Sequence, residues 1–78
     1  MKVDVITPDK TLFSGEAELV KLPGIDGSFE VMNYHAPIVS ILIKGEVKLV
    51  DHNKKERIIE INGGVIEVNN NICRILAE

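Results

Sequence analysis

The sequence predicts an all-β fold, an antiparallel β-sandwich of about ten short strands in a single domain, and three observations support this. Apolar residues recur at every second position in nearly every segment, which is the period of a half-buried strand. Valine and isoleucine dominate these runs, and β-branched side chains suit a pleated surface. Turn residues separate the runs at intervals of roughly 8–12 residues, and no segment of ordinary helical length is left between them.

The chain length limits the size of the core. Surface scaling for 78 residues and 8.6 kDa gives a folded surface of roughly 4,700 Å², with about 60% of the unfolded chain's surface buried. One domain over residues 1–78 with a thin core is expected, and large enzyme architectures are excluded.

The individual strands follow from local alternation. Val3 and Val5 alternate with Lys2 and Asp4 in the first of them. The expected strands are 2–7, 10–13, 17–22, 28–32, 36–43, 46–51, 55–60, 64–69 and 72–77.

Turn signals separate these strands. Thr7–Lys10 contains a proline that presets φ for a turn, and Pro23–Gly27 is expected to form a wider loop with two glycines. Asp51–Lys54 and Asn69–Asn71 predict two hairpin tips, since asparagine tolerates positive φ. Lys44-Gly45 is expected to end one strand, and Asn62-Gly63-Gly64 fits a tight turn or a bulge.

The segment 36–43 departs from clean alternation because it is apolar on both faces. Only one face of each sheet meets the core of a two-layer sandwich, so the other face exposes either Val39 and Ile41 or Ile38 and Leu42. A binding surface explains this pattern. A central strand that is covered by a neighbouring loop or packed at a closed edge explains it equally well.

Composition excludes several classes of protein. Nine Lys plus Arg against twelve Asp plus Glu give a net charge of −3, and no basic block is present, so nucleic acid is not an expected partner. The single cysteine, Cys73, cannot form an intramolecular disulfide, which favours a reducing compartment. The apolar runs are far shorter than the ~18 residues of a membrane-spanning helix. A soluble cytoplasmic protein without a signal peptide is expected.

Candidate chemical groups are few. His52 lies at a predicted hairpin tip, His35 lacks a second metal ligand nearby, and Ser28 lacks the G-x-S-x-G context of a nucleophile. We therefore expect no catalytic, cofactor or metal site. An alternative function is a stand-alone carrier or ligand-binding sandwich, in which Lys54 or Lys55 at a hairpin tip would carry a modification.

Four motifs occur in order along the chain: T-P-x-x-x-x-F-S-G from Thr7, L-P-G-x-x-G from Leu22, H-A-P from His35 and G-G-x-x-E-V from Gly63. With these motifs, essentially the whole chain resembles one family, the N-terminal β-sandwich domain of the epsilon subunit of F-type ATP synthase. The resemblance implies a flattened ten-stranded sandwich without a catalytic site or cofactor. It implies a rotor subunit that bridges the gamma subunit and the ring of c subunits, couples ion-driven rotation to ATP synthesis, and reaches the catalytic alpha/beta head indirectly.

The resemblance also assigns surfaces and a location. It places the gamma subunit against Thr7, His35, Val39, Ser40 and Ile41, and the c-ring against Asp26, Gly27, Ser28 and Phe29. The protein is expected at the cytoplasmic face of the bacterial inner membrane, held by protein contacts without inserting into the bilayer.

Two features depart from the family pattern. Asn33-Tyr34 stands where members usually carry Pro-Gly, so a different corner is expected there, and Glu30 occupies a position that is often glycine. The family commonly continues into an inhibitory helical hairpin. If Glu78 is a natural terminus, hairpin inhibition and nucleotide binding are expected to be absent.

Overall fold

The computed structural model describes all 78 residues as seven strands without a helix, and therefore without a helix that could cross a membrane. The strands are β1 (Lys2–Ile6), β2 (Thr11–Glu16), β3 (Leu19–Gly24), β4 (Gly27–Met32), β5 (Ile38–Val50), β6 (Glu56–Asn69) and β7 (Ile72–Ala77). The predicted all-β class is confirmed. The number of strands is seven rather than about ten.

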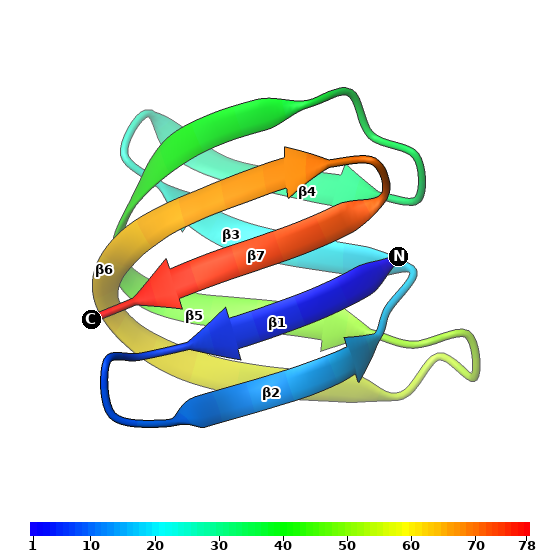
Figure 1. Ribbon diagram of the computed structural model, residues 1–78, viewed down its shortest axis with the longest axis horizontal. Coiled ribbons are helices and arrows are strands. Elements are labelled where there is room, and N and C mark those ends of the chain that lie inside the picture. The colour runs from blue at the N-terminus through cyan, green and yellow to red at the C-terminus, as the bar shows by residue number, and fades with distance from the viewer.

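All seven strands belong to one sheet in the order β2-β1-β7-β6-β5-β3-β4. Every neighbouring pair is antiparallel except β1 and β7, which run parallel (Figure 1). The expectation of a purely antiparallel sheet is therefore wrong at this one pair. The first and last strands of the chain, β1 and β7, lie side by side next to the edge strand β2, and both contribute residues to the core.

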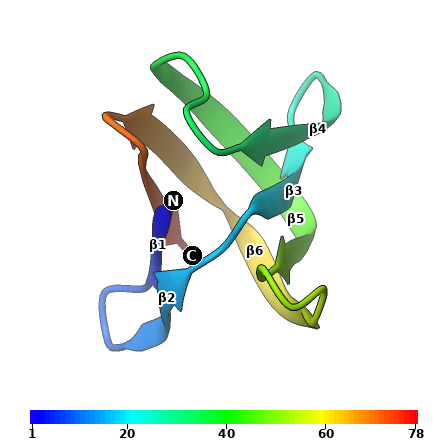
Figure 2. The same cartoon turned by 90° about the vertical axis from the view of Figure 1, so that its right-hand side faces the viewer.

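The sheet folds over on itself through its two longest strands. β5 and β6 have 13 and 14 residues, and their pairing continues from Ile38↔Val68 to Val50↔Glu56 in one constant register. Figure 2 shows both strands curving so that the two halves of the sheet face each other. The predicted strands 36–43 and 46–51 are therefore one strand, and 55–60 and 64–69 are another.

The alternation of buried and exposed residues shifts by one position at the bend in β5 and β6. In β5 the buried residue is even-numbered before the bend, at Leu42, and odd-numbered after it, at Val47. In β6 the change runs from Ile61 to Ile66. Gly63 (φ 135°) and Gly64 (φ 148°) adopt backbone angles that other residues rarely take, at the point where the strand rotates. The break in alternation thus marks a rotation of the strand rather than an end.

A single apolar cluster forms the core. It contains 16 buried residues, and no polar or charged side chain is buried. Val3 and Val5 of β1, Ile66 of β6 and Ile75 of β7 are fully inaccessible to solvent. The accessible surface of 4899 Å² is close to the roughly 4,700 Å² that scaling gives for this mass.

The predicted hairpin tips are confirmed. Asn70 and Asn71 have positive φ between β6 and β7, and Asp51 Oδ1 accepts hydrogen bonds from the backbone N–H groups of Asn53 and Lys55 between β5 and β6. The expected wide loop at 23–27 is instead a tight turn, because the β3–β4 pairing continues to Gly24↔Gly27.

Candidate interaction surface

A row of apolar side chains crosses the outward face of the sheet, perpendicular to the strands. Ile6 of β1 is paired with Leu76 of β7, Leu76 with Val65 of β6, and Val65 with Ile41 of β5. At the end of the row, the backbone N–H of Ile25 donates to the carbonyl oxygen of Ile41 at 3.0 Å. We call these five residues the apolar row; all but the half-buried Ile6 are exposed.

Further apolar and charged residues border the apolar row. On β5, Val39 and Ile43 flank Ile41 on the same face, and Val39 is 72% exposed. Beside the row lie charged residues in register, with Arg74 paired to both Asp4 and Glu67. Contiguous exposed apolar side chains with a charged border are typical of protein–protein interfaces.

The structure shows which face of segment 36–43 is exposed to solvent. Val39 and Ile41 point to solvent, whereas Leu42 is buried and Ile38 packs against the core. Ser40 is paired with the buried Ile66, so it lies on the core-side face and is only partly exposed. Of the five residues assigned to the gamma subunit, only Val39 and Ile41 share the outward face of β5.

Thr7 and His35 lie at opposite ends of the molecule, in the β1–β2 and β4–β5 connections (Figure 1). Thr7 Oγ1 accepts from the backbone N–H of Lys10 at 3.1 Å and so shapes its own turn. The backbone N–H of His35 donates to the Met32 carbonyl at 3.1 Å, and its ring Nδ1 lies 2.7 Å from the Ala36 carbonyl oxygen. These residues therefore do not form one patch with Val39 and Ile41.

The residues assigned to the c-ring lie at the tip of the β3–β4 hairpin, with Asp26 in the turn and Gly27, Ser28 and Phe29 at the start of β4. Asp26, Gly27 and Ser28 are exposed, whereas Phe29 packs against the core. Phe29 also fills the space beside Gly24, where an added Cβ would lie 2.7 Å from its Cε1 atom. Asp26, Gly27 and Ser28 are therefore accessible to a partner, whereas Phe29 stabilises the hairpin tip by packing against the core. Ile25, at the same tip, joins this turn to the apolar row.

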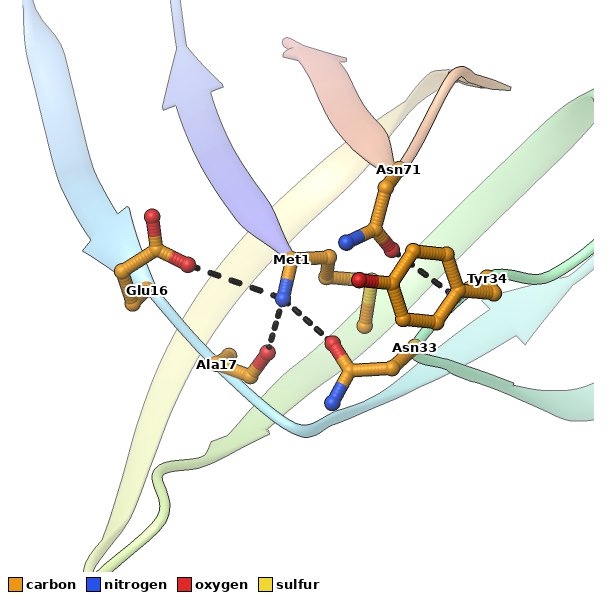
Figure 3. A network of polar contacts seen from close by, with 6 residues as sticks. All are labelled: Met1, Glu16, Ala17, Asn33, Tyr34 and Asn71. Carbon is orange, nitrogen blue, oxygen red and sulfur yellow. Dashed lines mark hydrogen bonds and ion pairs between the residues drawn. The ribbon is translucent and has the colours of Figure 1, made fainter.

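A polar network fixes the β4–β5 connection (Figure 3). The Met1 ammonium donates to the Ala17 carbonyl at 2.9 Å and to Asn33 Oδ1, and forms an ion pair with Glu16. The backbone N–H of Tyr34 donates to Asn71 Oδ1 at 2.7 Å. Tyr34 has φ 63°, so this corner keeps a left-handed conformation that glycine favours even though a tyrosine occupies it.

Sequence reasoning missed part of this surface. It did not identify the half-buried Ile6 or the exposed Ile25, Ile43, Val65 and Leu76 as members of an apolar surface. Adjacent apolar pairs such as Val65-Ile66 and Ile75-Leu76 carried a signal, because one member of such a pair must face away from the core.

Two observations concern metal ligands and the single thiol. No group of three or more His, Cys, Asp or Glu residues is arranged to hold a metal ion. Cys73 is fully buried on β7, and burial, with a smaller contribution from Asp4, raises the pKa of its thiol to about 11.

The buried thiol is expected to make stability depend on alkaline pH. The folded state holds the thiol proton more tightly than the unfolded state, so its stabilising contribution is complete below about pH 9 and is lost toward pH 11. We expect the free energy of unfolding to fall by about 2 kcal/mol between pH 8 and pH 10.5. Urea unfolding of the parent chain and of Cys73→Ala at pH 8 and pH 10.5 measures the difference. An equal loss in both chains would contradict a role for the thiol.

Comparisons with known proteins agree on one family. The model of the ATP synthase delta/epsilon chain β-sandwich domain matches residues 1–78. The ATP synthase epsilon chain of Chlorobium limicola is 43% identical over 77 residues, which cover 99% of this chain and 88% of that protein. The epsilon chain of Alkalilimnicola ehrlichii is 33% identical over 78 residues, all of this chain and 56% of that protein.

Solved structures share the fold. A chain in the mitochondrial ATP synthase of Euglena gracilis, in an assembly described as OSCP/F1/c-ring, superposes with a TM-score of 0.90 at 19% identity, covering 96% of this chain and 48% of that one. A chain in the central stalk and c-ring of the Tetrahymena thermophila enzyme gives a TM-score of 0.81 at 18% identity, covering 97% of this chain and 61% of that one. On the family match and the sequence identities, this chain belongs to the family of ATP synthase delta/epsilon chain β-sandwich domains.

Proposed function

We propose that this chain is the non-catalytic rotor subunit of an F-type ATP synthase, bridging the gamma subunit and the c-ring. The observation that carries the proposal is the exposed apolar row on a chain whose relatives are ATP synthase epsilon chains. Chains of the same fold occur in one assembly described as OSCP/F1/c-ring and in another described as central stalk and c-ring.

In this proposal the gamma subunit and the c-ring bind two different surfaces of the chain. The gamma subunit covers the apolar row together with Val39, because exposed apolar side chains on neighbouring strands are paired side by side here. The c-ring contacts the β3–β4 turn, at Asp26, Gly27 and Ser28. Ile25 lies where the two surfaces meet, so a force applied at the turn reaches the sheet directly through the hydrogen bond from Ile25 to Ile41.

The mechanism is mechanical transmission. The chain makes 49 backbone–backbone hydrogen bonds, and 39 of them are within the strands, so the sheet resists shear along its whole width. β5 and β6 pass through both halves of the sheet in unbroken register, which connects the two halves by continuous backbone. A subunit of this kind couples ring rotation to the gamma subunit without a catalytic group of its own. It acts on the catalytic alpha/beta head only through gamma.

The location follows from these contacts. In this proposal the chain is part of a membrane-associated complex and lies at the cytoplasmic face of the bacterial inner membrane. It is held there by gamma and the c-ring rather than by insertion into the bilayer.

A tagged pull-down from detergent-solubilised membranes of the source organism tests the function. Mass spectrometry of the retained proteins is expected to identify the gamma subunit, the c subunit and the alpha and beta subunits. Circular dichroism of the eluted bait establishes that it is folded. Absence of gamma and the c subunit with a folded bait would contradict the proposal.

A further inference from the structure

Tyr34 combines a strained backbone with an exposed side chain. Its φ of 63° lies in the left-handed region, where a bulky residue is an outlier. Its side chain is 84% exposed, so packing within the chain does not offset the strain. Strained residues of this kind persist where the surrounding structure determines the backbone, and they gather at functional sites.

The surroundings of Tyr34 hold its backbone and leave its ring free. The Tyr34 N–H donates to Asn71 Oδ1 at 2.7 Å, and Asn71 is itself fixed in the β6–β7 turn. On one side, Asn33 Oδ1 accepts from the Met1 ammonium; on the other, the His35 N–H donates to the Met32 carbonyl. In Figure 3 the interactions reach the Tyr34 backbone, and none involves the phenol hydroxyl. A rigid corner therefore presents a free aromatic ring.

The chain connects this ring to the surface that the proposed function assigns to the gamma subunit. The connection continues from Tyr34 through the exposed Pro37 into Val39, the most exposed apolar residue of β5. A shallow surface groove of about 470 Å³ runs here, lined by Pro37, Ile38, Val39, Glu67, Val68 and Asn69. Tyr34 thus lies in the connection that leads into β5, the strand whose exposed Val39 the proposed function assigns to the gamma subunit.

We propose that Tyr34 is an anchor residue for the gamma subunit; this inference rests on the proposed function. A tyrosine binds best in a pocket that covers its ring and offers a polar group to its hydroxyl, and such anchors supply a large share of interface energy. The gamma surface that faces this corner therefore has a pocket for one phenol ring. The backbone of this corner has a conformation that glycine favours, so the corner does not need the ring, and the proposal assigns the ring to recognition.

Two substitutions separate the ring from the corner. Tyr34→Gly relieves the strain, and Tyr34→Asn keeps a residue that tolerates positive φ without an aromatic ring. The matched control is Lys54→Gly, because Lys54 is another exposed non-glycine residue with φ 64°. We expect the melting temperature of all three variants to stay within about 5 °C of the parent value or to rise above it. Differential scanning calorimetry measures this.

Binding to the purified catalytic head with its gamma subunit, measured by calorimetric titration, gives the decisive readout. Both Tyr34 variants are expected to bind about 10- to 30-fold more weakly, whereas Lys54→Gly changes affinity less than about twofold. Parent-like binding by Tyr34→Gly and Tyr34→Asn would overturn the anchor role and leave the rotor function intact. Failure of the parent chain itself to bind would instead overturn the proposed function and, with it, this inference.

Discussion

Replacement of Gly64 by alanine is expected to lower the free energy of unfolding by about 3–5 kcal/mol. An added Cβ would lie 2.3 Å from the carbonyl oxygen of Leu76 and 3.1 Å from Ala77 Cα, and both atoms belong to the backbone of β7. The φ of 148° adds strain for any residue with a side chain. Because β6 and β7 are paired here, relief of the clash requires the strands to separate. Urea unfolding followed by circular dichroism measures the loss.

Gly27→Ala is the matched control for this substitution. Gly27 also has a φ that disfavours side chains, at 122°, but an added Cβ would meet no atom within 4 Å. Its expected cost is the backbone strain alone, about 1–2 kcal/mol. Equal losses for the two variants would show that the close approach of β7 to Gly64 contributes nothing to stability.

The regular strands were predictable because burial on one face imposes a period of two. Val3 and Val5 on β1, and Cys73 and Ile75 on β7, are buried at alternate positions while their neighbours are exposed or only partly buried. The asparagine turn was equally predictable, since Asn70 and Asn71 adopt the positive φ for which this residue type is suited.

The bend in β5 and β6 could not be predicted from the alternation of buried and exposed residues. A strand that rotates while its pairing continues changes which residues face the core, and in the sequence this change resembles a turn. Gly45, Gly63 and Gly64 strengthened that reading, because glycine also marks turns. Only the constant β5–β6 register distinguishes one long strand from two short ones.

The candidate surface was found only in part for a related reason. Val39 and Ile41 were identified because one strand was apolar on both faces. The rest of the apolar row depends on tertiary register, since parallel pairing of the chain ends brings Ile6 beside Leu76. Because Ile6 and Leu76 lie far apart in the sequence, no local sequence pattern predicts that they are neighbours.

Ile41→Asp is expected to weaken binding to the gamma subunit by about 100-fold while the domain stays folded. Ile41 lies in the middle of β5 with Val65 paired to it on β6, and its side chain is 56% exposed. An aspartate here places a charge at the centre of the apolar row, where a bound partner would remove it from water without a counter-charge. Calorimetric titration against the catalytic head with its gamma subunit measures the affinity.

Ile58→Asp provides the control because it makes the same chemical change on a paired strand residue of similar exposure. Ile58 is 54% exposed on β6 and is paired with Lys48 rather than with a residue of the apolar row. Both variants lose a β-branched residue from a strand, so their unfolding free energies should fall by a similar amount, about 1 kcal/mol. Only Ile41→Asp should lose affinity. Equal affinities for the two folded variants would show that gamma binds another face, and unfolding of Ile41→Asp alone would show that its strand acts as core.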